Sequence, residues 1–113
     1  SRNSISDLLE DAAEYMKENC SHRFSVDNLA GQFGMESKRF SAEFQKHVGI
    51  TPVRYLTELR IDRAKELLVS CDCTIKQIAS YIGYDDPYYF SRIFKKITGI
   101  SPRKYQDQKK IHH

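Results

Sequence analysis

Long apolar runs are absent from the sequence, and nothing in it resembles the charged and then apolar segment of a signal peptide. A membrane-spanning helix needs about 20 consecutive apolar residues, so we expect no contact with a membrane. Of the 113 residues, 40% are hydrophobic and 29% are charged. This composition is typical of a globular protein with one domain or two very small lobes.

Cysteine and histidine are scarce and irregularly placed, which argues against a disulfide framework, a metal site or a thiol enzyme. Cys20, Cys71 and Cys73 are odd in number and include no C-x-x-C pair. The four histidines show no ligand spacing. We therefore predict cysteines that are buried or incidental, a cytoplasmic location, and neither a metal nor a cofactor.

The residue sets that carry catalysis are missing as well. The sequence shows no paired carboxylates, no Ser/His/Asp set and no glycine-rich phosphate loop. We therefore predict that the protein is not an enzyme.

An initiator methionine is also lacking, since the chain starts at Ser1, and we expect an excised domain of a larger protein.

Charges of the two signs are unevenly distributed along the chain. Residues 1–22 contain two basic and five acidic residues, for a net charge of −3. Residues 23–113 contain 16 basic and 10 acidic residues, for a net charge of +6. A polyanion would bind to this basic part, although a solvated mixed surface would give the same totals.

An amphipathic helix is predicted over residues 4–20. Its apolar face consists of Ile5, Leu8, Leu9, Ala12 and Met16, and its opposite face is acidic. We expect residues 1–22 to pack on the next lobe or to link to a missing N-terminal domain. Phosphates would repel the acidic face, so it should point away from any nucleic acid.

The most informative stretch is GYDDPYYFSRIFKKITGISP, at residues 83–102. Asp86 is a favourable N-cap, Pro87 suits the first helical position, and Gly99 suits the position after the helix. One face of this helix is apolar, with Phe90, Ile93, Phe94 and Ile97. The other side has no acid and carries Tyr88, Tyr89, Arg92, Lys95 and Lys96. A basic, aromatic face opposite a buried stripe is typical of a helix that enters a nucleic-acid groove.

This pattern occurs twice in the chain. Ser25 can cap a first helix that ends at Gly34, and Ser37 can cap a second helix. From residue 74 the pattern repeats, with Thr74 and Gln77 as a capping box. Pairs matched at an offset of 49 and then 50 include Val26/Ile75, Leu29/Ile78, Gly34/Gly83, Phe40/Phe90, Phe44/Phe94, Gly49/Gly99, Pro52/Pro102 and Tyr55/Tyr105. These matches indicate an internal duplication of a helix-turn-helix unit.

The predicted fold is all-α, with two helix-turn-helix subdomains joined by a long central helix and about seven helices in all. The predicted segments are a first lobe at residues 23–51, a joining helix at 52–72, a second lobe at 73–106 and a flexible basic tail at 107–113. Arg60 and Arg63 fall inside the apolar arc of the joining helix. We expect ion pairs or snorkelling there in preference to phosphate contact.

Specific motifs are most complete in the second unit, at Ile78–Ala79, Gly83–Tyr84, Tyr89–Arg92, Phe94–Lys96, Gly99 and Ser101–Pro102. With these motifs, residues 24–106 resemble the DNA-binding domain of the AraC/XylS family of bacterial transcriptional regulators. The resemblance implies sequence-specific binding of double-stranded DNA by two recognition helices, in major-groove segments roughly 34 Å apart. It also implies RNA polymerase as a partner and a missing N-terminal sensor or receiver domain.

The resemblance assigns candidate DNA contacts residue by residue. Base-facing candidates are Lys38, Arg39, Ser41, Ala42 and Gln45 in the first unit, and Tyr88, Tyr89, Ser91 and Arg92 in the second. Candidate phosphate contacts are Lys46, Lys95 and Lys96. The caps Ser25, Thr74 and Gln77 are further phosphate candidates, because helix N-termini bind phosphate. Arg92 is the clearest base reader, since arginine commonly bonds to O6 and N7 of guanine.

Three residues depart from the family pattern. Small stand-alone members tend to carry a large aromatic residue at the position of Lys38 and an arginine at that of Ala42, so base preference cannot be inherited from them. Gln106 stands where an arginine is frequent, which weakens one possible contact.

The alternative function is a helical adaptor that binds proteins and not DNA. It predicts an exposed apolar groove and no salt-sensitive affinity for DNA.

Overall fold

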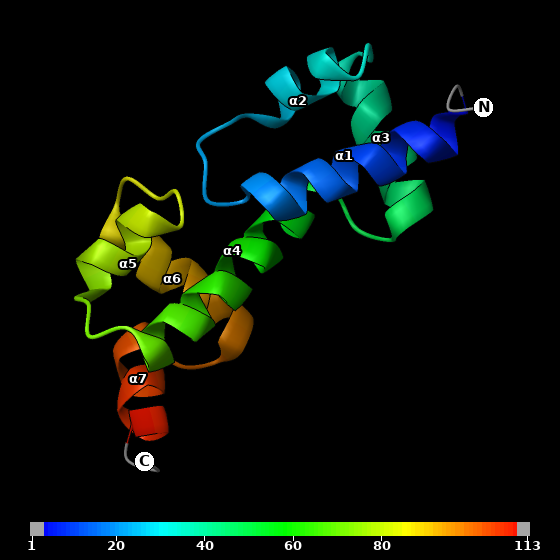
Figure 1. Cartoon of the computed structure of the whole chain (residues 1–113). Coiled ribbons are helices and arrows are strands. Elements are labelled where there is room, and N and C mark those ends of the chain that lie inside the picture. The colour runs from blue at the N-terminus through cyan, green and yellow to red at the C-terminus, as the bar shows by residue number, and fades with distance from the viewer. Residues whose placement is uncertain (1–3, 111–113) are drawn as a thin grey trace. The chain divides into compact units, whose positions relative to one another are not determined.

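The computed structural model describes residues 4–110, and its secondary structure over that range is entirely helical (Figure 1). The helices are α1 (Ile5–Asn19), α2 (Val26–Gln32), α3 (Ser37–Val48), α4 (Pro52–Ser70), α5 (Ile75–Tyr81), α6 (Pro87–Thr98) and α7 (Pro102–Lys110). The chain divides into two compact units, and the boundary lies within α4, between Thr57 and Glu58. The prediction of two helix-turn-helix subdomains joined by a long helix is confirmed. None of the described helices combines the length and apolar character that a bilayer crossing requires.

In the first unit, α2 and α3 form the helix-turn-helix pair and α1 packs against α3. The apolar face predicted for α1 supplies Leu9, Ala12 and Met16 to the interior, where each is almost completely buried. From α3, Phe40 and Phe44 are buried as well. The leading helix is therefore part of the first lobe's core.

In the second unit, α5 and α6 form the helix-turn-helix pair and α7 packs against α6. Its core cluster consists of Ile61, Ala64 and Leu68 from α4, Ile78 and Ala79 from α5, Ile82 from the turn, and Phe90 and Phe94 from α6. Leu67 and Tyr105 pack against this cluster from α4 and α7. The second half of α4 thus belongs to the second lobe's core and is not an isolated linker.

The duplication seen in the sequence extends to the geometry of the aromatic core. The ring centroids of Phe40 and Phe44 lie 5.6 Å apart, and those of Phe44 and Tyr55 lie 5.4 Å apart. In the second unit the matching pairs, Phe90–Phe94 and Phe94–Tyr105, are 5.8 and 5.5 Å apart. The same row of three rings therefore holds each second helix to the helix that follows it.

The predicted caps are confirmed at Ser25, Thr74, Asp86, Gly49 and Gly99. Both glycines adopt a left-handed backbone, with φ of 101° and 91°, and close α3 and α6. The prediction that Ser37 caps α3 is wrong, because Ser37 is the first helical residue. Glu36 holds the extended N-cap conformation and makes no side-chain capping hydrogen bond.

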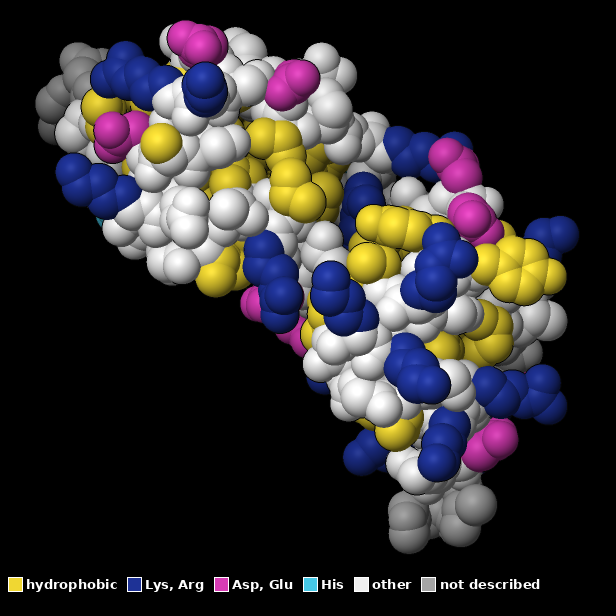
Figure 2. Space-filling view, turned by 180° about the vertical axis from the view of Figure 1, so that it is seen from behind, with side chains coloured by type: hydrophobic (Ala, Val, Ile, Leu, Met, Phe, Trp, Pro, Cys, Tyr) yellow, Lys and Arg dark blue, Asp and Glu magenta, His cyan; other side chains and the backbone are white. Residues whose placement is uncertain are grey.

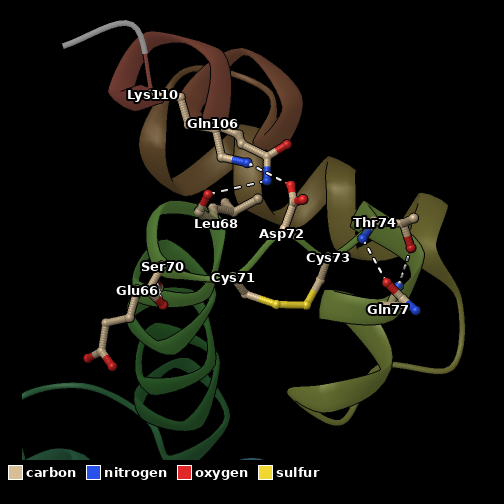
Figure 3. The surroundings of a disulfide bond; sticks show 10 residues. All are labelled: Glu66, Leu68, Ser70, Cys71, Asp72, Cys73, Thr74, Gln77, Gln106 and Lys110. Atoms are coloured by element: carbon tan, nitrogen blue, oxygen red, sulfur yellow. Dashed lines mark hydrogen bonds and ion pairs between the residues drawn. A yellow bond between two sulfur atoms is a disulfide. The ribbon is translucent and has the colours of Figure 1, made fainter. Parts of the chain in front are cut away.

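The cysteine pattern argued against a disulfide framework, but the structure contains one disulfide. Cys71 and Cys73 form a disulfide between α4 and α5 (Figure 3), while Cys20 keeps its thiol. Helix α4 ends at Ser70, two residues earlier than predicted, and the non-helical segment after it places the two cysteine Cα atoms 5.2 Å apart. That separation lies in the range that a disulfide spans.

The C-terminal segment is more ordered than predicted, because α7 continues to Lys110. Gln106 Nε2 donates a hydrogen bond to the carbonyl of Leu68 at 3.2 Å, and Lys110 Nζ lies 3.4 Å from a carboxylate oxygen of Asp72 (Figure 3). These two contacts tie α7 to the end of α4 and to the segment after it. The last part of the predicted tail, residues 111–113, lies outside the described residues.

The closing glycines provide a test of backbone geometry in the first unit. Gly49→Ala should lower the free energy of unfolding by about 1–2 kcal/mol, because an L-residue is strained in the left-handed region. Gly31→Ala should raise it by about 0.5–1 kcal/mol, because Gly31 lies inside helix α2. A Cβ at either position meets nothing within 4 Å. Urea unfolding of both variants measures the difference, and shifts of the same sign would contradict this account of α3's end.

Candidate nucleic-acid interface

Helix α6 presents a basic and aromatic face. Its start is fixed by Asp86, whose carboxylate accepts a hydrogen bond from the Tyr88 backbone N–H at 2.9 Å. Phe90 and Phe94 are fully buried, so the side chains about 180° away on the helix are outside. Those outward side chains are Tyr88, 77% exposed, and Tyr89, 45% exposed, with Arg92, Lys95 and Lys96.

Helix α3 presents the same five positions, 50 residues earlier in the chain. Lys38, Arg39, Ala42, Gln45 and Lys46 are all exposed, over the buried Phe40 and Phe44. The two serines among the base-facing candidates, Ser41 and Ser91, are half-buried at the edge of each face. Each helix therefore gathers its predicted base-facing and lysine candidates on one side.

Positive charge dominates this part of the second unit. Residues 87–110, which cover α6 and α7, contain seven basic residues and one acidic residue, Asp107. In the space-filling view, lysine and arginine side chains gather on the visible face of the second unit, with apolar side chains between them (Figure 2). Such a surface attracts a polyanion such as a nucleic-acid backbone.

The three polar phosphate candidates act as helix caps. Ser25 Oγ accepts a hydrogen bond from the Asn28 backbone N–H at 3.1 Å. Thr74 Oγ1 accepts one from the Gln77 N–H at 3.0 Å, and Gln77 Oε1 accepts one from the Thr74 N–H at 2.9 Å (Figure 3). Their capping role is confirmed, while their contact with phosphate stays a prediction.

Two of the arginines of α4, Arg60 and Arg63, make contacts of different kinds. Arg63 forms the predicted ion pair, with Nη1 2.7 Å from Glu66 Oε2. Arg60 places its guanidinium carbon 5.2 Å from the centre of the Tyr84 ring. That cation–π contact joins residues 24 positions apart, so no local sequence pattern could have indicated it.

Known proteins share the sequence pattern of these helix-turn-helix units. A family model described as a helix-turn-helix domain matches residues 29–108. The MmsAB operon regulatory protein of Pseudomonas aeruginosa is 34% identical over 94 residues, which make up 83% of this chain and 31% of that protein. The chain belongs to the AraC/XylS family. Members of this family are DNA-binding transcriptional regulators and not enzymes.

Solved structures agree with the assignment to the AraC/XylS family. The C-terminal domain of AraT, a response regulator from Geobacillus stearothermophilus, superposes with a TM-score of 0.86 at 31% identity, over 96% of this chain and 88% of that one. The DNA-binding domain of AdpA, solved with a target DNA, superposes with a TM-score of 0.88 over 93% of this chain and 95% of that one. Its 24% identity supports the fold alone. This AraC-type chain spans about a third of the P. aeruginosa relative's length.

The capping box at α5 gives a test of the local structure. Thr74→Ala should lower the free energy of unfolding by about 1 kcal/mol, because it leaves the Gln77 N–H without its side-chain acceptor. Thr74→Ser keeps the hydroxyl and should stay near the wild-type value. Chemical denaturation followed by circular dichroism makes the comparison, and equal losses for both substitutions would show that the methyl group matters and the cap does not.

Proposed function

We propose that this chain binds double-stranded DNA sequence-specifically, with α3 and α6 as recognition helices in successive segments of the major groove. The observation that supports this proposal most directly is the pair of matched exposed faces. Each helix turns the same five positions outward over two buried phenylalanines, and most of those side chains are basic, amide or aromatic. A major groove admits one α-helix, and its base edges are read by side chains of this kind.

We assign different contacts to the two ends of each helix. In helix-turn-helix proteins the N-terminal residues of the recognition helix reach the base edges. The base readers are therefore Lys38, Arg39 and Ala42 on α3 and Tyr88, Tyr89 and Arg92 on α6, with Gln45, Ser41 and Ser91 at the margins. Lys46, Lys95 and Lys96 lie in the last turn of their helices and contact phosphates.

The recognised site is not a palindrome. At matched positions the two helices carry Lys38 and Tyr88, Arg39 and Tyr89, and Ala42 and Arg92. Such different side chains select different bases, so the two half-sites differ in sequence. Arg92 reads guanine through two parallel hydrogen bonds, whereas Ala42 offers only a methyl group for apolar contact with thymine.

In the cell, we infer that this chain is the DNA-binding part of a larger bacterial regulator in the cytoplasm. Support comes from the P. aeruginosa operon regulator, which is about three times as long, and from AraT, whose matching part is the C-terminal domain of a response regulator. The remaining part is an N-terminal sensor or receiver domain. RNA polymerase is the partner through which a promoter-bound regulator acts. Neither comparison favours the adaptor alternative.

A salt titration tests DNA binding. The ligand is a duplex selected from random DNA by repeated binding, and affinity is measured by fluorescence anisotropy at several salt concentrations. If Lys46, Lys95 and Lys96 each neutralise one phosphate, log K should fall with log salt at a slope of about −3 or steeper. An adaptor would enrich no sequence and show no salt-sensitive affinity for DNA.

Paired substitutions on α6 separate base reading from phosphate contact. Arg92→Ala should cost about 1–3 kcal/mol on the selected site and relax the preference at one base pair. Lys96→Ala should weaken binding to selected and random duplexes alike and reduce the salt slope by about 1. Competition binding against single-base variants of the site gives both readouts. Equal losses on selected and random DNA for Arg92→Ala would refute its base-reading role.

A further inference from the structure

Four side chains of the second unit follow one another from α4 to the exposed face of α6. The guanidinium carbon of Arg60 lies 5.2 Å from the centre of the Tyr84 ring. The Tyr84 and Tyr89 rings meet edge to face, with centroids 5.8 Å apart and planes at 60°. The guanidinium carbon of Arg92 lies 5.9 Å from the centre of the Tyr89 ring. The proposed base reader therefore rests on a ring that is itself in contact with a second ring.

Tyr84 is a firm support for this arrangement. Its side chain packs against the core cluster, and its ring centroid lies 5.9 Å from that of the buried Phe90. Its backbone N–H donates a hydrogen bond to the Ala79 carbonyl at 2.9 Å, which fixes it to α5. Because Tyr84 is held from both sides, Tyr89 has one fixed neighbour that limits where its ring can lie.

A guanidinium group can use its flat face and its edges at the same time. In a cation–π contact the cation lies over the flat face of the aromatic ring, whose negative charge density attracts it. Bidentate hydrogen bonds to guanine O6 and N7 use the N–H groups in the guanidinium plane. The contact of Arg92 with the Tyr89 ring is of the cation–π kind and occupies none of the guanidinium N–H groups with a hydrogen-bond acceptor, so those donors stay available for a base. It also limits the rotamer freedom that an arginine loses on binding.

We propose that Tyr89 is a positioning residue, which holds the Arg92 guanidinium ready for the major-groove edge of a guanine and does not read a base itself. This inference rests on the base-reading role proposed for Arg92. Tyr89 was predicted to face the bases. This inference instead gives it the role of orienting Arg92, which makes the base contact. Tyr88, at 77% exposed against 45% for Tyr89, is the tyrosine of α6 that faces the DNA directly.

The contact of a tyrosine ring with an arginine on the recognition helix has no counterpart at the matching positions of the first unit. The positions that match Tyr84, Tyr89 and Arg92 in the first unit are occupied by Met35, Arg39 and Ala42. Those three residues include no aromatic ring, and the position that matches Arg92 carries an alanine. The first recognition helix must therefore orient its long Lys38 and Arg39 side chains by other means.

A double-mutant cycle between Tyr89 and Arg92 tests the inference. The variants are Tyr89→Leu, Tyr89→Phe, Arg92→Ala and the double substitution of Tyr89→Leu with Arg92→Ala. The readout is the preference for the selected duplex over its single-base variants, measured by competition anisotropy. Tyr81→Leu is the matched control, because Tyr81 lies on α5 and is 63% exposed. Thermal unfolding of each variant shows whether it remains folded.

If Tyr89 acts through Arg92, Tyr89→Leu should reduce the preference at the base pair that Arg92 reads by about two- to fivefold. Tyr89→Phe keeps the ring and should stay within about twofold of the wild type, as should Tyr81→Leu. In the Arg92→Ala background, Tyr89→Leu should have no further effect, because interacting residues are not additive.

Three results would overturn the inference while leaving the proposed function intact. They are an additive loss in the double variant, a loss of preference at a base pair other than the one Arg92 reads, and an equal loss for Tyr89→Phe and Tyr89→Leu. A different result, Arg92→Ala with unchanged base preference, would instead remove the proposed role of Arg92 and this inference with it.

Discussion

Burial of two phenylalanines one turn apart, in each of two helices, is the constraint on which the interface depends. Phe40 and Phe44, like Phe90 and Phe94, are almost completely inaccessible to solvent. Their burial fixes the rotation of α3 and α6 about their own axes, since a helix has one apolar stripe and that stripe must face the core. Rotation in turn decides which five side chains of each helix can reach a ligand. Truncating such a ring to alanine commonly costs about 3–5 kcal/mol.

One scaffold is therefore used twice with different exposed chemistry. The side-chain caps of α2 and α5, the closing glycines, the aromatic rows and the buried Pro52 and Pro102 recur in both units. The outward positions differ, because nothing in the core restricts them. The exposed chemistry of each helix can therefore change without any change in the fold, which is the separation that the proposed recognition of two different half-sites requires.

Much of this could be predicted from the sequence, because helical periodicity and caps are local. The stripe of Phe90, Ile93, Phe94 and Ile97 located α6, and the duplication extended that assignment to α3. Features that depend on the path of the chain in three dimensions were missed. The Cys71–Cys73 disulfide requires a turn after Ser70, and the contact of Arg60 with Tyr84 joins distant residues. Helix α7 extends beyond its predicted end because Gln106 and Lys110 find partners near the end of α4.

The turn before each recognition helix has a consequence for how firmly that helix begins. Asp86 and Glu36 occupy the same N-cap position, but the shorter carboxylate accepts the Tyr88 N–H and the longer one makes no capping bond. A side-chain cap stabilises a helix start by about 0.5–2 kcal/mol. The first turn of α3 therefore opens more readily than that of α6. Of the two repeats, the first has the greater latitude to adjust the first turn of its second helix to a bound ligand, whereas the shape of that turn is already set in the second repeat.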